Sequence, residues 1–246
     1  GILDPESNVL YGEGGAGLFS DGKLMARTKD RGRMRQAFEA FVAAGANPDI
    51  LIEAEPHLGT DHLLELIPRM RQRILDLGGE IRFGARLEAV QIENGQLRGL
   101  VVNGQAIAAD HCVLATGHSA GDVHRLLERA GIRLEAKAMA IGVRLEVPQQ
   151  RINIAQYGRY ACDSRLGAAS FRVTAAPEKA GLRPVHSFCM CPGGEVIACA
   201  SDPGALTTNG MSYAARGGSC ANAAFLVPVG PEDYPVLDGC SEVLRG

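Results

Sequence analysis

Two Asn-Gly pairs lie nine residues apart in this chain, at Asn94-Gly95 and Asn103-Gly104, and they limit the fold more than any other feature. Asn-Gly suits the two-residue type I′ hairpin turn, in which both residues need a positive φ. Segments with strand-like patterns flank the turns over 87–93, 97–102 and 105–108. The sequence therefore predicts a three-stranded antiparallel meander. We expect a short strand over 81–83 just before it.

The residues after the meander predict a strand, a turn open to a ligand, and a helix. The run 111–115 is short and continuously apolar, which is typical of a strand covered on both faces in a parallel sheet. It leads into Ala115-Thr116-Gly117, where a ligand could approach the backbone closely. Ser119 and Asp122 resemble a capping box for a helix that Gly131 closes. A plain strand-to-helix turn would explain this unit equally well.

Helical patterns precede the meander, and strand patterns follow the second helix. Apolar spacing predicts a helix over 32–44 and a longer one that begins at Thr60 or Asp61 and ends at Gly78-Gly79. Pro68 should kink this longer helix or delay its start. After about residue 135 we expect a mostly antiparallel domain. Its predicted strands cover 139–147, 170–174, 185–191, 195–200 and 224–229, with irregular loops at 148–168 and 201–222.

Composition excludes several protein classes. The chain has 31 glycines in 246 residues without a Gly-X-Y period, and it is 46% hydrophobic, so it is neither collagen-like nor disordered. Its net charge of −3 argues against a nucleic-acid or acidic-membrane partner. No apolar run approaches the roughly 20 residues that span a bilayer. The seven cysteines suggest free thiols in a reducing cytoplasm. These features favour a globular protein that handles a small molecule.

A glycine-rich loop over 12–22 is a candidate ligand site. Its spacing fits neither a Walker loop nor the dinucleotide fingerprint. Exposed backbone N–H groups, the Ser20 hydroxyl and the Lys23 charge nevertheless suit a flat ligand or a diphosphate. A flexible surface loop is the alternative interpretation.

Cys189 and Cys191 form a C-x-C pair at the end of a predicted strand. Residues two apart in a strand face the same way, so both thiols could enter one site. No second cysteine pair supplies further metal ligands, and we expect no metal. The thiols could be small core fillers or could lie beside a redox cofactor. Cys189, Cys191 and His118, which follows Ala-Thr-Gly directly, are the candidate catalytic residues.

Six segments in this order closely resemble the bacterial FAD-dependent dehydrogenases of the NAD(P)/FAD-dependent oxidoreductase family: GEGGAGLFSDGKL, PHLGTDHL, LATGHSA, IGVRLE, SFCMCPGG and NGMS. The resemblance implies an α/β (α+β) fold, with a partial glutathione-reductase-type FAD-binding domain and a mostly antiparallel substrate domain. The expected FAD-binding domain covers 1–135 and includes a helical segment at 32–78. The expected substrate domain covers 136–230, and at 231–246 the chain is expected to begin its return to the FAD-binding domain. Family members are about twice this length. We therefore expect an internal fragment that lacks the amino-terminal Rossmann strand.

The resemblance also implies a function: FAD-dependent hydride transfer through the flavin N5 to or from an unidentified small-molecule substrate, with NAD(P)H as a possible electron donor. The fragment alone is expected to be inactive and to bind FAD weakly or not at all. The alternatives are a non-catalytic truncated domain, a flavin-fold scaffold or a relative of RNA-modification proteins. The expected cofactor-binding residues are Gly14, Gly15, Ala16, Gly17, Ser20, Asp21, Gly22, Lys23, Leu87, Ala115, Thr116, Gly117, Gly193, Gly194, Asn209 and Gly210.

Overall fold

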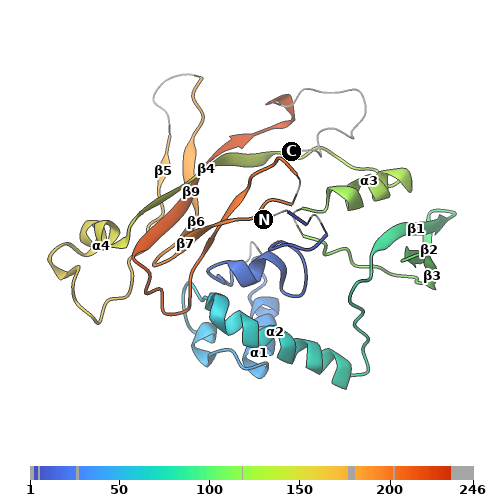
Figure 1. The fold of residues 1–246 in the computed structure, drawn as a ribbon, viewed down its shortest axis with the longest axis horizontal. Helices are drawn as coiled ribbons and strands as arrows, with labels where there is room; N and C mark the ends of the chain where they lie inside the picture. Colours follow the sequence, from blue (N-terminus) through green and yellow to red (C-terminus); the bar gives the residue numbers. More distant parts are fainter. Residues whose placement is uncertain are drawn as a thin grey trace. The chain divides into compact units, whose positions relative to one another are not determined.

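The computed structural model describes residues 3–4, 6–25, 28–117, 119–176, 181–201 and 203–233, and Figure 1 shows the order of its elements. It is a mixed α/β structure whose sheets are mostly antiparallel, as expected. The chain divides into two compact units. The first unit joins the residues up to Gly79 with Ala140–Pro228, and the second joins Glu80–Met139 with the residues from Val229 onward. The functional division into an FAD-binding and a substrate domain stays a prediction.

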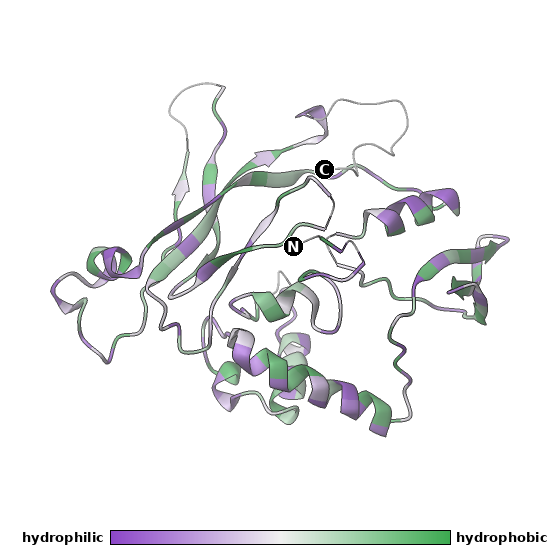
Figure 2. Cartoon of the chain, viewed as in Figure 1, coloured by the Kyte–Doolittle hydropathy of each residue, from purple (hydrophilic) through white to green (hydrophobic). Residues whose placement is uncertain are grey.

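Two helices form the helical part of the first unit. They are α1 (Arg31–Ala43) and α2 (Gly59–Asp76), accompanied by the short 3-10 helices η1 (Gly15–Phe19) and η2 (Pro48–Leu51). Their apolar faces meet in a buried cluster, as the alternation of hydrophobic and hydrophilic residues along α2 suggests in Figure 2. The cluster consists of Ala44, Ala46, Ile50, Leu58 and Leu66. The sequence prediction of both helices is confirmed.

The start of α2 differs from the prediction. The helix begins at Gly59, and neither Thr60 nor Asp61 caps it. Both side chains instead bond to other segments of the unit. The Thr60 hydroxyl donates to the Leu18 carbonyl, and Asp61 accepts a 2.9 Å bond from the Ala214 N–H. Pro68 lies inside the helix and does not delay its start.

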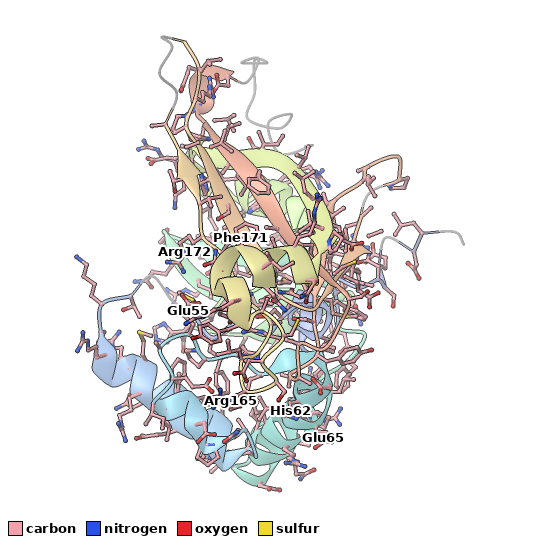
Figure 3. The ribbon with its side chains drawn as sticks, turned by 90° about the vertical axis from the view of Figure 1, so that its left-hand side faces the viewer. Glu55, His62, Glu65, Arg165, Phe171 and Arg172 are labelled. Atoms are coloured by element: carbon pink, nitrogen blue, oxygen red, sulfur yellow. The ribbon has the colours of Figure 1, made fainter. Side chains whose placement is uncertain are left out.

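The strands of the first unit form two sheets. One contains β4 (Met139–Pro148), β5 (Thr174–Ala175), β6 (Val185–Cys191) and β9 (Cys220–Val229) in the order β4-β9-β6-β5. The other pairs β7 (Glu195–Ala198) with β8 (Thr208–Met211). Met190, Ala221 and Ala223 are buried against partly buried residues that include Phe171 and Phe225. Phe171, labelled in Figure 3, stacks on Phe225 with 6.3 Å between the ring centroids.

Three predictions for this half of the chain are wrong. The stretch 148–168 contains the helix α4 (Gln149–Tyr157) and the 3-10 helix η3 (Gly158–Tyr160), and 201–222 contains β8 and the start of β9. The predicted strand 170–174 is reduced to its last residue in β5. Distant bonds explain the unpredicted helix, because Gln149 at its start donates to the Ala169 carbonyl and accepts from the Gly193 N–H.

The meander of the second unit is confirmed. It consists of β1 (Leu87–Glu93), β2 (Gln96–Val102) and β3 (Gln105–Ala108), paired antiparallel in the order β1-β2-β3. Both turns have the two positive φ values that a type I′ turn needs: 53° and 74° at Asn94-Gly95, and 47° and 75° at Asn103-Gly104. The helix α3 (Gly121–Arg129) follows, and Gly131 has the expected positive φ just beyond it.

Three local predictions for the second unit are wrong. Residues 81–83 form no strand, because the Asn103 side chain bonds to the Gly84 carbonyl and the Arg86 N–H and holds this segment in a turn. Residues 111–115 also form no strand: Val113 is 90% exposed, and no described strand pairs with the run. The residue at the N-cap of α3 is Ala120, without a side-chain cap, so the expected capping box at Ser119 is absent.

Candidate functional site

A buried carboxylate organises one end of the first unit. Asp21 is 1% exposed, and two cationic side chains contact it. Arg216 binds both of its oxygens, with Nε–Oδ1 at 3.0 Å and Nη2–Oδ2 at 2.5 Å. The Lys23 ammonium lies 2.7 Å from Oδ2, and the Ser212 hydroxyl donates to Oδ1. We call these four residues the Asp21 cluster.

Backbone pairing fixes the position of Asp21. The segment around Gly22 runs antiparallel to the segment before α2: Leu58 N–H donates to the Gly22 carbonyl at 3.0 Å, and Leu24 N–H donates to the Pro56 carbonyl at 2.9 Å. The Gly59 N–H donates to the carbonyl of Asp21 itself at 3.2 Å. The loop therefore presents the Asp21 side chain from a rigid backbone rather than from a free surface loop.

The electrostatics of Asp21 favour its charged form. Burial would raise the pKa of this carboxyl, but the hydrogen bond from Arg216 and the charge and hydrogen bond of Lys23 outweigh burial. The pKa therefore lies below its usual value. Asp21 is a carboxylate at neutral pH and holds its two cations in place.

The C-x-C pair lies directly beside this cluster. The Lys23 ammonium donates to the Met190 carbonyl, between the two cysteines. Arg144 of β4 donates through Nη1 to the Cys189 carbonyl at 3.2 Å and to Asn222 Oδ1 at 2.7 Å. The Cys191 thiol donates to the Cys189 carbonyl at 3.4 Å. Residues from β4, β6 and β9 thus converge on the loop that carries Lys23.

Strand β6 is not regular at the cysteines, so the strict alternation on which the sequence prediction relied is wrong. Phe188 pairs with Ala224 and Cys191 pairs with Asn222, which leaves one extra residue on β6. Cys189 lies in this β-bulge with a φ of +46°, a region that residues with a Cβ rarely occupy. Because the bulge interrupts the alternation, the i, i+2 spacing does not by itself place the two thiols on one face.

The two thiols have opposite acidities. A hydrogen bond from the Cys191 thiol outweighs the effect of burial, and with the charges of Lys23 and Arg144 it lowers the pKa of Cys189 to about 6. The same hydrogen bond and burial raise the pKa of Cys191. Cys189 is therefore the anionic thiol of the pair at neutral pH, and Cys191 stays protonated.

Three glycines expected to bind the cofactor are enclosed by protein atoms. A Cβ on Gly193 would collide with the Arg216 carbonyl, and one on Gly194 with the Met211 carbonyl. A Cβ on Gly210 would lie 2.7 Å from the Cys191 sulfur and 2.6 Å from Arg144 Nη1. Their small size lets β6, β8 and the Arg216 segment pack closely around the cluster.

The hydrogen-bond donors around the Asp21 cluster fit a ligand that carries several acceptor oxygens, such as a flavin dinucleotide. Arg144 Nε and Asn222 Nδ2 are buried without a hydrogen-bond partner, and the Asn222 residue is only 1% exposed. Buried polar atoms in proteins are usually hydrogen-bonded, so two such donors are unusual. Lys23 and Arg216 share the Asp21 carboxylate, and Arg144 adds a positive charge beside the Cys189 carbonyl. A Cβ would meet open space at both Gly12 and Gly17, so their backbone is accessible. Flavin carbonyl groups and a diphosphate are acceptors of the kind that these donors need.

The structure brings together several of the predicted site residues. Asp21, Lys23, Cys189 and Cys191 share the contacts described above, and Asn209 Nδ2 donates to the Phe19 carbonyl at 2.9 Å. Ser20 lies close by, since its carbonyl accepts from the Ser212 N–H at 3.5 Å. Leu87 and 115–117 belong to the second unit, where 115–117 are exposed. His118 lies outside the described residues.

Five residues of the site are not predicted from the sequence: Arg144, Gln149, Ser212, Arg216 and Asn222. One signal was present: Arg144 is the cation in an otherwise apolar stretch of β4. The other residues give no local signal, because each has a bonding partner that lies 44 to 195 positions away in the chain.

Two cavities lie apart from the cluster residues. In the second unit, Leu87 lines a cavity of about 340 Å³ with Arg86, Asp122, Arg125 and Arg129 among its other walls. In the first unit, a cavity of about 230 Å³ is lined by residues that include Leu58, Leu66 and Arg69, together with His62 and Glu65, which Figure 3 labels. Glu65 pairs with Arg69 at 3.3 Å there.

Neither a metal site nor a membrane-spanning helix is found among the described residues. Within the part of the chain that the structure describes, no three His, Cys, Asp or Glu side chains gather to hold a metal ion. None of the described helices has the length and apolar character that crossing a membrane requires.

Comparison with known proteins relates part of the chain to flavoproteins. Residues 138–245 match the family described as FAD-dependent protein, C-terminal domain-like. An uncharacterized protein of Clostridium beijerinckii is 47% identical over 234 residues, which cover 95% of this chain. The chain spans only 44% of that relative's length. These similarities support a flavoprotein-related domain, and they agree with the resemblance found in the sequence at this coarse level.

Proposed function

We propose that this chain is part of an FAD-dependent oxidoreductase of the dehydrogenase type, with a glutathione-reductase-type FAD-binding domain. One observation carries the proposal. Segments 12–24, 187–194 and 209–212, which resemble the family separately in sequence, meet around Asp21, and two of them lie within the part of the chain that matches the FAD-dependent family. A surface loop with no ligand role would not need a buried, doubly paired carboxylate.

Different residues of the site would contact different parts of FAD. The backbone at Gly12 and Gly17 would lie against the diphosphate or the ring, because a Cβ at either position would meet open space. Lys23 and Arg144 would balance negative charge, and the unpartnered Arg144 Nε and Asn222 Nδ2 would donate to carbonyl groups. When bound, FAD supplies the two-electron chemistry, taking a hydride from an organic substrate or from NAD(P)H.

Purification of the complete polypeptide tests this proposal. The protein is expected to be yellow, and denaturation is expected to release FAD that chromatography identifies. Replacing Lys23 by Gln is expected to weaken FAD binding about tenfold, the cost of one charge-assisted bond. Lys29→Gln is the matched control, since Lys29 is an exposed residue outside the cluster. A folded, colourless protein that takes up no added FAD would show that the proposal is wrong.

A further inference from the structure

Cys189 differs in its surroundings from the other cysteines that the structure describes. Cys112 and Cys162 are exposed, Cys191 and Cys199 are buried, and Cys220 is partly buried like Cys189 but lies outside the bulge. Cys189 is partly buried and lies in the bulge of β6. Its +46° φ is a conformation that the surrounding structure must enforce, and such positions cluster at functional sites.

Positive charge dominates around Cys189. The loop between η1 and α1 contributes Asp21 and Lys23, β4 contributes Arg144 and Glu146, and the segment after β8 contributes Arg216. Asp21 is already shared between Lys23 and Arg216, and a Glu146 oxygen accepts from the Val196 N–H at 3.3 Å. Arg144 contacts only neutral acceptors among its described partners. One more negative charge at Cys189 would therefore be stabilised.

Two hydrogen-bond donors near Cys189 have no acceptor. Arg144 donates through Nη1 both to Asn222 Oδ1 and to the Cys189 carbonyl. The remaining donors of these two side chains, Asn222 Nδ2 and Arg144 Nε, therefore belong to residues bonded to each other beside Cys189. Both atoms are buried and unpartnered. A buried donor without an acceptor is costly, and in the chain without flavin a ligand that brings a carboxylate or amide oxygen would remove that cost.

From these observations we infer that Cys189 is a nucleophilic thiolate that reacts with low-molecular-weight disulfides. The Cys189 sulfur forms a new S–S bond with one half of the disulfide, and the original S–S bond breaks. The other half leaves with the electron pair as a thiolate and takes a proton from water. Lys23 and Arg144 stabilise the anionic sulfur before attack, and they attract the negative charge of the leaving group. This chemistry needs no oxidant other than the disulfide.

Cys191 acts on Cys189 rather than on the substrate. Its thiol stays protonated, and its side-chain hydrogen bond with Cys189 favours the anionic form of the Cys189 sulfur. The activity goes beyond the proposed function, because it requires no flavin.

The pH dependence of thiol modification tests the inference. The protein is treated with iodoacetamide at several pH values, and the rate at each cysteine is read by peptide mass spectrometry. An ordinary thiol loses reactivity by roughly 200-fold between about pH 9 and pH 6, because its thiolate fraction falls. Cys189, with a pKa of about 6, is expected to lose only about twofold. The peptides of Cys112 and Cys162 provide the reference in the same sample.

A disulfide probe and two variants complete the experiment. With 5,5′-dithiobis(2-nitrobenzoate) at about pH 6, the mixed disulfide is expected at Cys189, and Cys189→Ser is expected to abolish the early release of the coloured thiol. Cys112→Ser is the matched control and should leave that release unchanged. Lys23→Gln is expected to shift the alkylation midpoint of Cys189 to higher pH.

Failure of this inference is distinguishable from failure of the flavin proposal. If Cys189 in the unmodified protein loses reactivity as steeply as an ordinary thiol, or is not labelled at all, the inference is wrong whatever the variants do. That result would not change whether the purified protein carries FAD. A colourless protein with a reactive Cys189 would reject only the flavin proposal.

Discussion

At the scale of single residues, Asp21 holds together more of the site than any of its neighbours. Replacing it by Asn would leave Arg216 and Lys23 close together without their shared counter-charge. We expect Asp21→Asn to lower the free energy of unfolding by about 3 kcal/mol, the lower end for breaking a buried pair, because both cations keep some solvent exposure. Urea unfolding followed by circular dichroism would measure this loss.

The pH dependence of this effect has a definite direction. Because the pKa of Asp21 is lowered in the folded state, its contribution is complete above the ordinary carboxyl pKa of about 4. The contribution disappears as the pH falls through the lower folded value. The difference between wild type and Asp21→Asn should therefore shrink below about pH 4. Asp163→Asn is the control, since Asp163 forms a similar two-bond pair with Arg165 on the surface, and its loss should change stability little at any pH.

At the scale of elements, the two ends of α2 provide a matched pair of glycines. Gly59 and Gly78 both have positive φ, at 75° and 83°. A Cβ on Gly59 would collide with the backbone of Ala214 near the cluster, whereas one on Gly78 would meet open space. We expect Gly78→Ala to cost about 1 kcal/mol through backbone strain alone. Gly59→Ala should cost at least twice as much and should also slow labelling of Cys189. Equal urea midpoints for the two variants would contradict the close contact with Ala214.

The elements also separate what could be predicted from the sequence from what could not. The meander turns were predictable because Asn94-Gly95 and Asn103-Gly104 determine their own backbone conformation. The helix α4 was not, because Gln149 is held by bonds to Ala169 and Gly193. The apolar run 111–115 looks like a strand locally, but strand formation depends on a neighbour with which to pair.

The candidate site shows the same limit. Asp21 and Lys23 were predicted as cofactor-binding residues because they follow the glycine-rich loop. The partners Ser212 and Arg216 lie 191 and 195 positions from Asp21, so no spacing rule connects them. The bulge at Cys189 was also not predictable, since β6 and β9 must pair before the extra residue is defined.

At the scale of the whole molecule, the two units differ in how many apolar side chains they bury. Both clusters of buried apolar side chains in the described residues belong to the first unit. Among the described residues 80–139, only Gly99 and Ala120 are fully buried. Since burial of apolar surface is the main source of stability, we expect the second unit to open more easily.

Hydrogen exchange can test this difference with two comparable strands. β2 and β9 each have a hydrogen-bonded strand on both sides, so the number of neighbouring strands is the same. Most of the first half of β9 is buried, whereas β2 has a single buried residue. The amides of β2 are therefore expected to exchange at least roughly tenfold faster than those of β9, a difference of about 1.4 kcal/mol in opening free energy. A common rate for both strands would instead mean that the two units unfold as one cooperative body, because only a shared global opening gives strands of such unequal burial the same protection.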